Sequence, residues 1–425
     1  MKLKIFLKKI PFLVILVRKL RKLQQNIKIF VTDFKHRRTI EHCIKSVSKS
    51  KTNKVIKVGF IVQLEALWNK QEPIFSEMLN RNDFEVKLLV VPNCDWSDHN
   101  KFDNYDNNSF LKNYPNEAIK VLDDNNNLCN IKKLNFDYVF FPRPYDAYLP
   151  LGLKSTDLVK FTRCCYIPYG YSLSDNFNDG NIDSSFFDNI YMEFTESDYI
   201  QSLLFQKYKK SCDKGIRHFE YLGFPCLEKY LNIKPREKIS TITWTPRWSY
   251  EEKHGGSNFI EYKDSFLNFC KKLPKDIKVI FRPHPLMFDE LIKKNILSCE
   301  EKDNYVKNLN SLNVKMNFED PINVVLDATD LLITDFSSII TEFFLANKPI
   351  IYCKKNIEFN ESGKKLEKFM YQTHSWDEIE NYCFKLIDDG DVLRTDRQKF
   401  IEQEFSDIQN SSKKIVDRII KDYRS

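Results

Sequence analysis

Glycine is scarce in this sequence, which has 10 glycines among its 425 residues. It contains neither G-x-G-x-x-G nor G-x-x-x-x-G-K-[ST], the motifs whose glycines let a backbone approach phosphates closely. This absence argues against dinucleotide binding and P-loop chemistry. The 11 cysteines are scattered, and no two have the C-x-x-C spacing. They indicate free thiols in a reducing compartment rather than disulfides or a zinc site, and we expect no metal and no cofactor.

Acidic residues are nearly absent from the first 57 residues, which contain 17 Lys and Arg but only Asp33 and Glu41. The net charge of +15 in this segment leaves −8 for the rest, because the whole chain carries +7. A nucleic-acid-binding protein would spread its basic surface over the folded domain. The distribution therefore indicates a basic N-terminal segment attached to a mildly acidic enzyme, and we expect no nucleic acid as partner.

The N-terminal segment has no apolar run long enough to cross a bilayer, which takes about 20 residues. A basic start and an apolar middle resemble a signal peptide, but the basic run 18–22 stands where a small-residue cleavage site should be. Apolar residues recur here at intervals of three and four, with Lys and Arg between them: Leu13, Leu16, Leu20, Leu23, Ile27 and Phe30. This pattern predicts a basic amphipathic helix that lies on an anionic membrane surface; the alternative is a basic helix packed on the body or on a partner.

Beyond this segment, short apolar runs alternate with helical patterns. Such alternation indicates an α/β protein with mostly parallel sheets covered on both faces. One series of strands and helices begins near Val55 and a second begins after Arg236. We therefore expect two doubly wound halves that face each other across a cleft, with ligands beyond the carboxyl ends of the strands.

The apolar run Leu331–Thr334 predicts a buried strand that ends at Asp335. Ser337 and Ser338 then open a predicted amphipathic helix, whose free N–H groups would favour an anion. Ser337 is a natural N-cap. Asp335 could cap the turn or orient an Arg or His, and Glu342 could accept hydrogen bonds from ribose hydroxyls.

Two other predicted strands end in basic residues. Arg247 follows the strand that includes Thr245, and it offers a fixed, bidentate donor for a phosphate. The strand 277–281 ends in Arg282-Pro283-His284-Pro285, where two prolines hold the backbone on either side of the imidazole. His284 in such a rigid loop could donate to a phosphoryl oxygen or carry a proton.

Together these segments resemble the CDP-glycerol glycerophosphotransferase family, the polymerases and primases of teichoic acids and related capsular polymers. The resemblance covers roughly the second half of the chain and rests on five segments: 221–225, 244–247, the His284 loop, 334–338 and 348–350. It implies the GT-B arrangement of two Rossmann-like domains, with doubly wound parallel sheets, behind an N-terminal basic amphipathic helix.

The resemblance also suggests how the chain is divided. We expect a membrane-associating segment and connector in residues 1–53, an acceptor domain in 54–232 and a nucleotide-donor domain in 233–405. A C-terminal helix in 406–425 would pack back towards the first domain. The protein would lie on the cytoplasmic face of the cell membrane, as a peripheral protein.

By the same resemblance, certain residues would bind a CDP-activated polyol donor. Arg247, Arg282, His284, Ser337 and Ser338 would surround its diphosphate, together with Thr245 and Asp335, and Glu342 would contact its ribose. The family usually carries a His-Gly pair in its first domain, where the histidine is proposed as the base that deprotonates the acceptor. Here the corresponding segment is Pro168-Tyr169-Gly170. Because tyrosine is a poor base at neutral pH, the candidates for this role are Tyr169, Asp175 and His284.

Three functions remain open from the sequence. The first is transfer of a polyol phosphate from a CDP-activated donor to a lipid-linked or polymeric acceptor hydroxyl, with release of CMP, in teichoic acid or capsule synthesis. The second is transfer of a sugar from a UDP- or CMP-sugar by a GT-B glycosyltransferase. The third is a catalytically silent scaffold on the membrane, which the missing histidine would suit.

Overall fold

The structure is a computed structural model that describes residues 37–47, 55–92, 109–123, 125–175, 182, 184–251, 255–318 and 320–425. The basic amphipathic helix predicted within residues 1–30 lies outside these ranges. Among the residues that are described, no helix is both long enough and apolar enough to cross a membrane.

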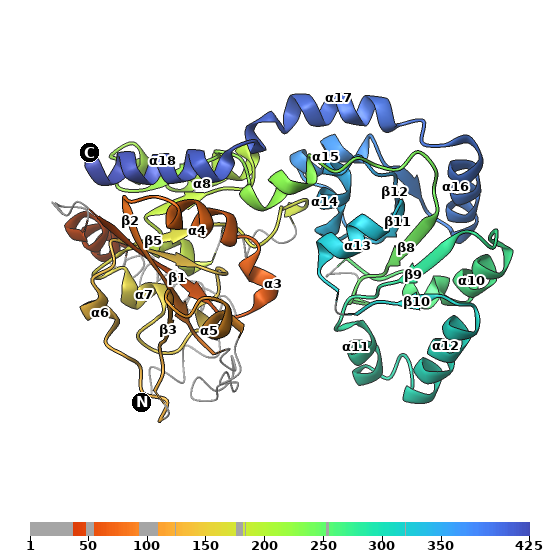
Figure 1. Ribbon diagram of the computed structural model, residues 1–425, viewed down its shortest axis with the longest axis horizontal. Helices are drawn as coiled ribbons and strands as arrows, with labels where there is room; N and C mark the ends of the chain where they lie inside the picture. Colours follow the sequence, from red (N-terminus) through yellow and green to blue (C-terminus); the bar gives the residue numbers. More distant parts are fainter. Residues whose placement is uncertain are drawn as a thin grey trace, which may run out of the picture.

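The first domain is built on a seven-stranded parallel sheet with the order β3-β2-β1-β4-β5-β6-β7 (Figure 1). Strand β1, which lies inside this sheet between β2 and β4, is buried along nearly its whole length, as expected for a parallel sheet covered on both faces. The order reverses direction between β1 and β4. The strands are β1 (Ile56–Val62), β2 (Phe84–Val90), β3 (Ala118–Lys120), β4 (Tyr138–Phe141), β5 (Arg163–Tyr166), β6 (Met192–Phe194) and β7 (His218–Glu220).

Short helices and 3-10 turns connect these strands. The helices are α3 (Glu65–Trp68), α4 (Glu72–Leu79), α5 (Ser109–Asn113), α6 (Ile131–Leu134), α7 (Ser155–Leu158), α8 (Asp198–Lys207) and α9 (Lys209–Cys212). The 3-10 turns are η1 (Asp146–Tyr148), η4 (Ser185–Asn189) and η5 (Pro225–Tyr230). The last of these, η5, leads from the first domain to the second.

The second domain has a six-stranded parallel sheet with the order β10-β9-β8-β11-β12-β13. Its direction reverses between β8 and β11, and an open α/β sheet binds ligands at such a switch point. The strands are β8 (Thr241–Thr245), β9 (Lys278–Phe281), β10 (Lys315–Met316), β11 (Leu331–Thr334), β12 (Ile350–Cys353) and β13 (Tyr371–Thr373). The helices are α10 (Phe259–Lys272), α11 (Met287–Lys293), α12 (Cys299–Ser311), α13 (Ile322–Ala328), α14 (Ile339–Leu345), α15 (Glu361–Glu367) and α16 (Trp376–Asp389).

Two hydrophobic clusters cover opposite faces of the second sheet. On β11, Leu331 and Ile333 pack into the cluster formed with α10, α12 and α16, whereas Leu332 packs into the cluster that continues into the first domain. The alternation follows from the two-residue period of a strand. The cores of the two domains are therefore continuous on one face of the second sheet.

Helix α14 lies at this junction, and all seven of its residues are buried. The prediction of an amphipathic helix was wrong here, because η5 and the second sheet cover the sides that would otherwise face water. Its N-cap is Ser338 rather than the expected Ser337, and the Ser338 side chain makes no capping hydrogen bond.

The C-terminal helices return to the first domain (Figure 1). Helix α17 (Arg394–Glu404) leaves the second domain, the 3-10 turn η7 (Ser406–Ile408) follows, and α18 (Ser411–Arg424) packs on α4. Asp422 of α18 accepts hydrogen bonds from the hydroxyls of Tyr138, at 2.6 Å, and Tyr191, at 2.7 Å. These buried contacts tie the end of the chain to the strands of the first sheet.

One expectation about local structure needs correction. The connector expected within residues 1–53 includes a helix at residues 37–47, which buries Ile40 and Ile44 against the first domain. Further along the chain, α3 and α4 are two separate helices, because Pro73 fits only in the first turn of a helix.

Candidate active site

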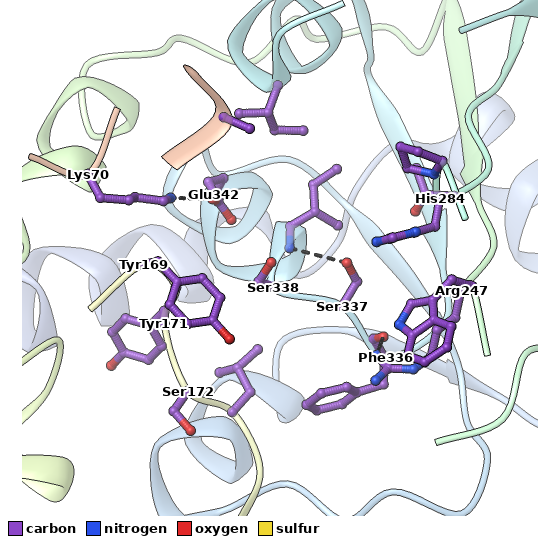
Figure 2. Close-up of a pocket in the computed structure, with 18 of the residues that line it drawn as sticks. Lys70, Tyr169, Tyr171, Ser172, Arg247, His284, Phe336, Ser337, Ser338 and Glu342 are labelled. Atoms are coloured by element: carbon purple, nitrogen blue, oxygen red, sulfur yellow. Dashed lines mark hydrogen bonds and ion pairs between the residues drawn. The ribbon is translucent and has the colours of Figure 1, made fainter. Parts of the chain in front are cut away.

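A cavity of about 850 Å³ separates the two domains at the carboxyl ends of their strands. Both domains line it, and Figure 2 shows their side chains facing each other across it. The structure brings together eight of the ten site residues expected from the sequence. These eight are Tyr169, Thr245, Arg247, Arg282, His284, Ser337, Ser338 and Glu342.

Arg247 leaves the end of β8 beside the switch point of the second sheet. Its backbone N–H donates to the Asp335 carboxylate at 2.9 Å, and its guanidinium donates to the Phe336 carbonyl at 2.6 Å. Asp335 is buried and also accepts from the Asn258 amide at 2.7 Å. Asp335 therefore does not line the cavity, contrary to the expectation that it binds the donor; it fixes the loop that presents Arg247.

Arg282 and His284 extend from the end of β9, the strand next to β8. Backbone bonds hold this loop in place: the N–H of Arg282 donates to the Trp244 carbonyl at 2.9 Å, and that of His284 donates to the Pro246 carbonyl at 3.2 Å. The Arg282 guanidinium donates to the Asn317 side chain. The two loops after β8 and β9 thus support each other and carry their basic side chains to one wall of the cavity.

The His284 imidazole faces the cavity with a defined donor (Figure 2). Its Nδ1 accepts the backbone N–H of Leu286 at 3.2 Å, so the proton of the neutral ring lies on Nε2. Partial desolvation, followed by the charges of Arg247 and Arg282, lowers the pKa of His284 to about 4. His284 is therefore a neutral hydrogen-bond donor at pH 7. It does not suit the role of a general base, because the nitrogen that faces the cavity, Nε2, already carries a proton.

Three hydroxyl groups lie at the same wall. The Ser337 hydroxyl accepts the backbone N–H of Ile339 at a long 3.5 Å, and Ser338 begins α14 (Figure 2). The Thr245 hydroxyl donates to the Thr334 hydroxyl at 2.8 Å, within the sheet. Ser337 and Ser338 are thus placed to contact a ligand, whereas the Thr245 hydroxyl donates its hydrogen bond to the neighbouring strand.

Glu342 is held by a lysine that sequence reasoning missed. Lys70, in the break between α3 and α4, places its ammonium 3.4 Å from a carboxylate oxygen of Glu342, and both side chains are about nine-tenths buried. The pair joins the first domain to the second across the cavity (Figure 2). The available signal was Pro73, which requires a new helix to start just after Lys70.

Tyrosines form the opposite wall, at the ends of β4 and β5. The hydroxyls of Tyr145 and Tyr169 lie 3.0 Å apart, and both residues line the cavity. Burial and the neighbouring Tyr145 raise the pKa of Tyr169 well above its usual value. Tyr169 therefore keeps its proton at neutral pH, which does not favour its role as the acceptor base and leaves that role a prediction.

Asp175, another candidate base, does not line the cavity. Its carboxylate accepts the Tyr199 hydroxyl at 2.9 Å, on the surface of the first domain. Within the described parts of the chain, no group of three or more His, Cys, Asp or Glu side chains is placed to hold a metal ion.

Comparison with solved structures supports the arrangement of the two domains. UDP-GlcNAc 2-epimerase from Neisseria meningitidis, bound to UDP-GlcNAc, is similar with a TM-score of 0.56 and 14% identity over 86% of this chain and 100% of the epimerase. MnaA from S. aureus, in a co-structure with UDP, has a TM-score of 0.53 and 12% identity over 86% of this chain and 96% of that one. UDP-GlcNAc 2-epimerase from Methanocaldococcus jannaschii has a TM-score of 0.51 and 11% identity over 82% and 100% of the chains.

These similarities, together with two Rossmann-like sheets that share an active-site cavity, define a GT-B-type protein, as expected from the sequence. Residues 224–421 match the family described as CDP-Glycerol:Poly(glycerophosphate) glycerophosphotransferase. This match over the C-terminal part of the chain confirms the predicted resemblance, and the protein is a transferase. A comparison with curated proteins found no match.

Proposed function

We propose that the protein transfers a polyol phosphate, glycerol phosphate or a relative, from a CDP-activated donor to an acceptor hydroxyl, with release of CMP. The observation that carries this proposal is the convergence of Arg247, Arg282 and His284 on one wall, within the segment that matches the family. Two guanidinium groups and a neutral N–H donor suit the two phosphates of such a donor. The acceptor is a lipid-linked or polymeric hydroxyl, and the pathway is teichoic acid or capsular polysaccharide synthesis.

In this reaction the acceptor oxygen forms a bond to the phosphorus that bears the polyol, and the bond from that phosphorus to the oxygen of CMP breaks. The proton of the acceptor hydroxyl passes to water or to the phosphate of the departing CMP. Most of the catalytic effect in phosphoryl transfer comes from positioning and from stabilisation of charge. Arg247 and Arg282 stabilise the charge that accumulates on the departing CMP. The Nε2–H of His284 donates to a phosphate oxygen, a role that its tautomer and low pKa favour.

One observation favours a second function, sugar transfer from a UDP- or CMP-sugar. The first-domain wall has Tyr169, which keeps its proton, where the family has its histidine. The two functions differ in the bond made, a phosphodiester in the first and a glycosidic bond in the second. A catalytically silent scaffold, the third possibility, would neither bind CDP nor release nucleotide.

A panel of donors tests the proposal. The protein is incubated with CDP-glycerol, other CDP-polyols, UDP-sugars and CMP-sugars in the presence of a lipid-linked acceptor, and free nucleotide is measured. We expect CMP from a CDP-polyol, and a phosphodiester signal in the ³¹P NMR spectrum of the product. Release of nucleotide only from sugar donors would instead establish the second function, and no release or binding of any nucleotide would contradict both.

We also propose that the basic N-terminal segment holds the protein on the cytoplasmic face of the membrane. The support is its charge and its apolar periodicity. Deletion of residues 1–30 should release the protein from anionic lipid vesicles in a sedimentation assay, while the release of CMP from the donor continues. Sedimentation of the truncated protein with the vesicles would contradict this proposal.

A further inference from the structure

We propose that Tyr145 and Tyr169 form a binding subsite for a neutral pyranose ring of the acceptor. This inference rests on the proposed function, because it identifies the chemical class that the same cavity accepts. It predicts that the hydroxyl that attacks the donor belongs to a sugar, and not to the anionic end of a polyol phosphate chain.

The geometry of the tyrosine pair suits a sugar. The two rings lie with their centroids 6.1 Å apart at an interplanar angle of 59°, and their hydroxyls meet at 3.0 Å. Tyr145 follows β4 and Tyr169 follows β5, so adjacent parallel strands hold both rings. Figure 2 shows Tyr169 across the cavity from Arg247 and His284, on the side from which an acceptor would approach the donor.

The charges around the pair differ from those on the opposite wall. The first-domain residues that line the cavity include no Asp or Glu, and Lys70, the one lysine or arginine among them, is committed to Glu342 at 3.4 Å. Arg143 does not line the cavity, but it is close enough to Tyr145 and Tyr169 for its charge to act on them. Its guanidinium lies 4.0 Å from the centre of the Tyr148 ring and donates a hydrogen bond of 3.2 Å to Gln63. The cations of this wall are thus engaged within the protein.

A pyranose ring matches such a surface on two counts. One face of the ring presents C–H groups, which pack against the negative face of an aromatic ring. The hydroxyls at its edge can exchange hydrogen bonds with phenols, each of which both donates and accepts. Because Tyr169 keeps its proton, the linked phenols remain available as neutral partners.

The end of a poly(polyol phosphate) chain fits less well. Its reacting hydroxyl lies next to a phosphodiester, and a buried anion is stable only when a cation or several N–H donors pair with it. The cations that line the cavity and serve phosphates, Arg247 and Arg282, are on the donor side. A phosphodiester at the tyrosine wall would therefore lose water without gaining an ion pair.

Ligand binding to the full-length protein tests the inference. The probes are octyl β-glucoside, octyl β-N-acetylglucosaminide and an octyl-tagged tri(glycerol phosphate), each titrated below its micelle concentration in the presence of CDP. Binding is followed by saturation-transfer NMR, and CDP affinity is measured separately by calorimetry. The variants are Tyr145→Leu and Tyr169→Leu, with Tyr250→Leu as the matched control, because Tyr250 is 42% exposed and does not line the cavity.

We expect the pyranosides to bind, and each cavity variant to raise their Kd by about tenfold, the equivalent of one aromatic contact. The affinity for CDP should stay unchanged, and Tyr250→Leu should bind like the wild type. If a leucine variant does not fold, Tyr145→Phe or Tyr169→Phe replaces it in the binding measurements; these variants keep the ring and remove only the hydroxyl.

Two results would overturn the inference. One is tighter binding of the tri(glycerol phosphate) than of the pyranosides; the other is no pyranoside binding by protein that binds CDP. In both cases CDP still binds, so the proposed donor site would stand. Failure of the wild-type protein to bind CDP would instead contradict the proposed function itself.

Discussion

The two walls of the cavity have similar backbone architecture but different side-chain chemistry. Each wall is made from loops at the carboxyl ends of a parallel sheet, close to the point where the strand order reverses. The second-domain wall carries Arg247, Arg282 and a neutral imidazole, whereas the first-domain wall carries phenols. Under the proposed function, the wall that binds the anionic donor thus faces a wall that is nearly uncharged.

The difference shows how one cavity can separate donor from acceptor. Cations on both walls would let the pyrophosphate bind in either orientation, because each wall would then offer partners to the same anion. The aromatic wall offers no comparable partner for a diphosphate. Specificity then follows from what one wall lacks as well as from what the other provides.

The strongest test of this contrast removes a donor from the cationic wall. His284→Ala and Arg282→Ala should each lower kcat/KM by about 10²–10³, the cost of removing one well-placed donor to developing charge. The measurement is steady-state release of CMP, with thermal unfolding to show that the fold survives. His374→Ala is the matched control, since His374 is exposed and does not line the cavity. Full activity in either variant would rule out this wall as the donor site.

The second test breaks the contact that crosses between the walls. Lys70→Met leaves the Glu342 carboxylate buried without its partner, and removal of one member of a buried ion pair costs about 3 kcal/mol. Urea unfolding should show this loss of stability. The double variant Lys70→Met/Glu342→Leu should recover most of it, because no charge is then left buried. A loss that is the same in the single and double variants would show that the pair does not hold the domains together.

The two walls also differ in how far the sequence could predict them. The cationic wall consists of short segments that directly follow apolar strands, so strand ends located its residues. The orientation of the side chains was predicted less well: Asp335 is buried beneath the loop, and the Thr245 hydroxyl bonds to Thr334. Which way a side chain faces depends on tertiary packing that strand periodicity does not encode.

The tyrosine wall was harder to anticipate. Tyr169 was found only because it stands where the related family has a histidine, and Tyr145 carries no charge that would mark it in a loop. The sheet orders depend on the same longer-range information. Strands of four or more apolar residues were predictable, whereas β3 and β13 are edge strands of three residues with partly exposed positions.

A third test sharpens the electrostatics of the cationic wall. Arg282→Gln should raise the pKa of His284 from about 4 towards its ordinary 6.5, because a neighbouring positive charge no longer opposes protonation. The titration is followed by ¹H–¹³C NMR, with His284→Gln to assign the signal. A pKa of His284 that is unchanged in Arg282→Gln would show that the two side chains do not share a site.

The sign of the pH effect on stability follows from the same shift. The folded protein holds His284 neutral between pH about 4 and 6.5, whereas the unfolded chain binds a proton there. The contribution of His284 to stability is therefore complete above pH 6.5 and declines as the pH falls towards 4. In Arg282→Gln, where the folded-state pKa of His284 lies closer to 6.5, the unfolding free energy should decline over a narrower range of pH.

The smallest expected effect lies on the tyrosine wall and separates a binding residue from a base. Tyr169→Phe removes the hydroxyl that meets Tyr145 at 3.0 Å but keeps the ring. One hydrogen bond to a neutral partner is worth about 1 kcal/mol, so KM for the acceptor should rise about fivefold with little change in kcat. Steady-state kinetics with varied acceptor measure both constants. A fall in kcat of a thousandfold would show that Tyr169 takes the acceptor proton after all, and the contrast between a charged and a neutral wall would then fail.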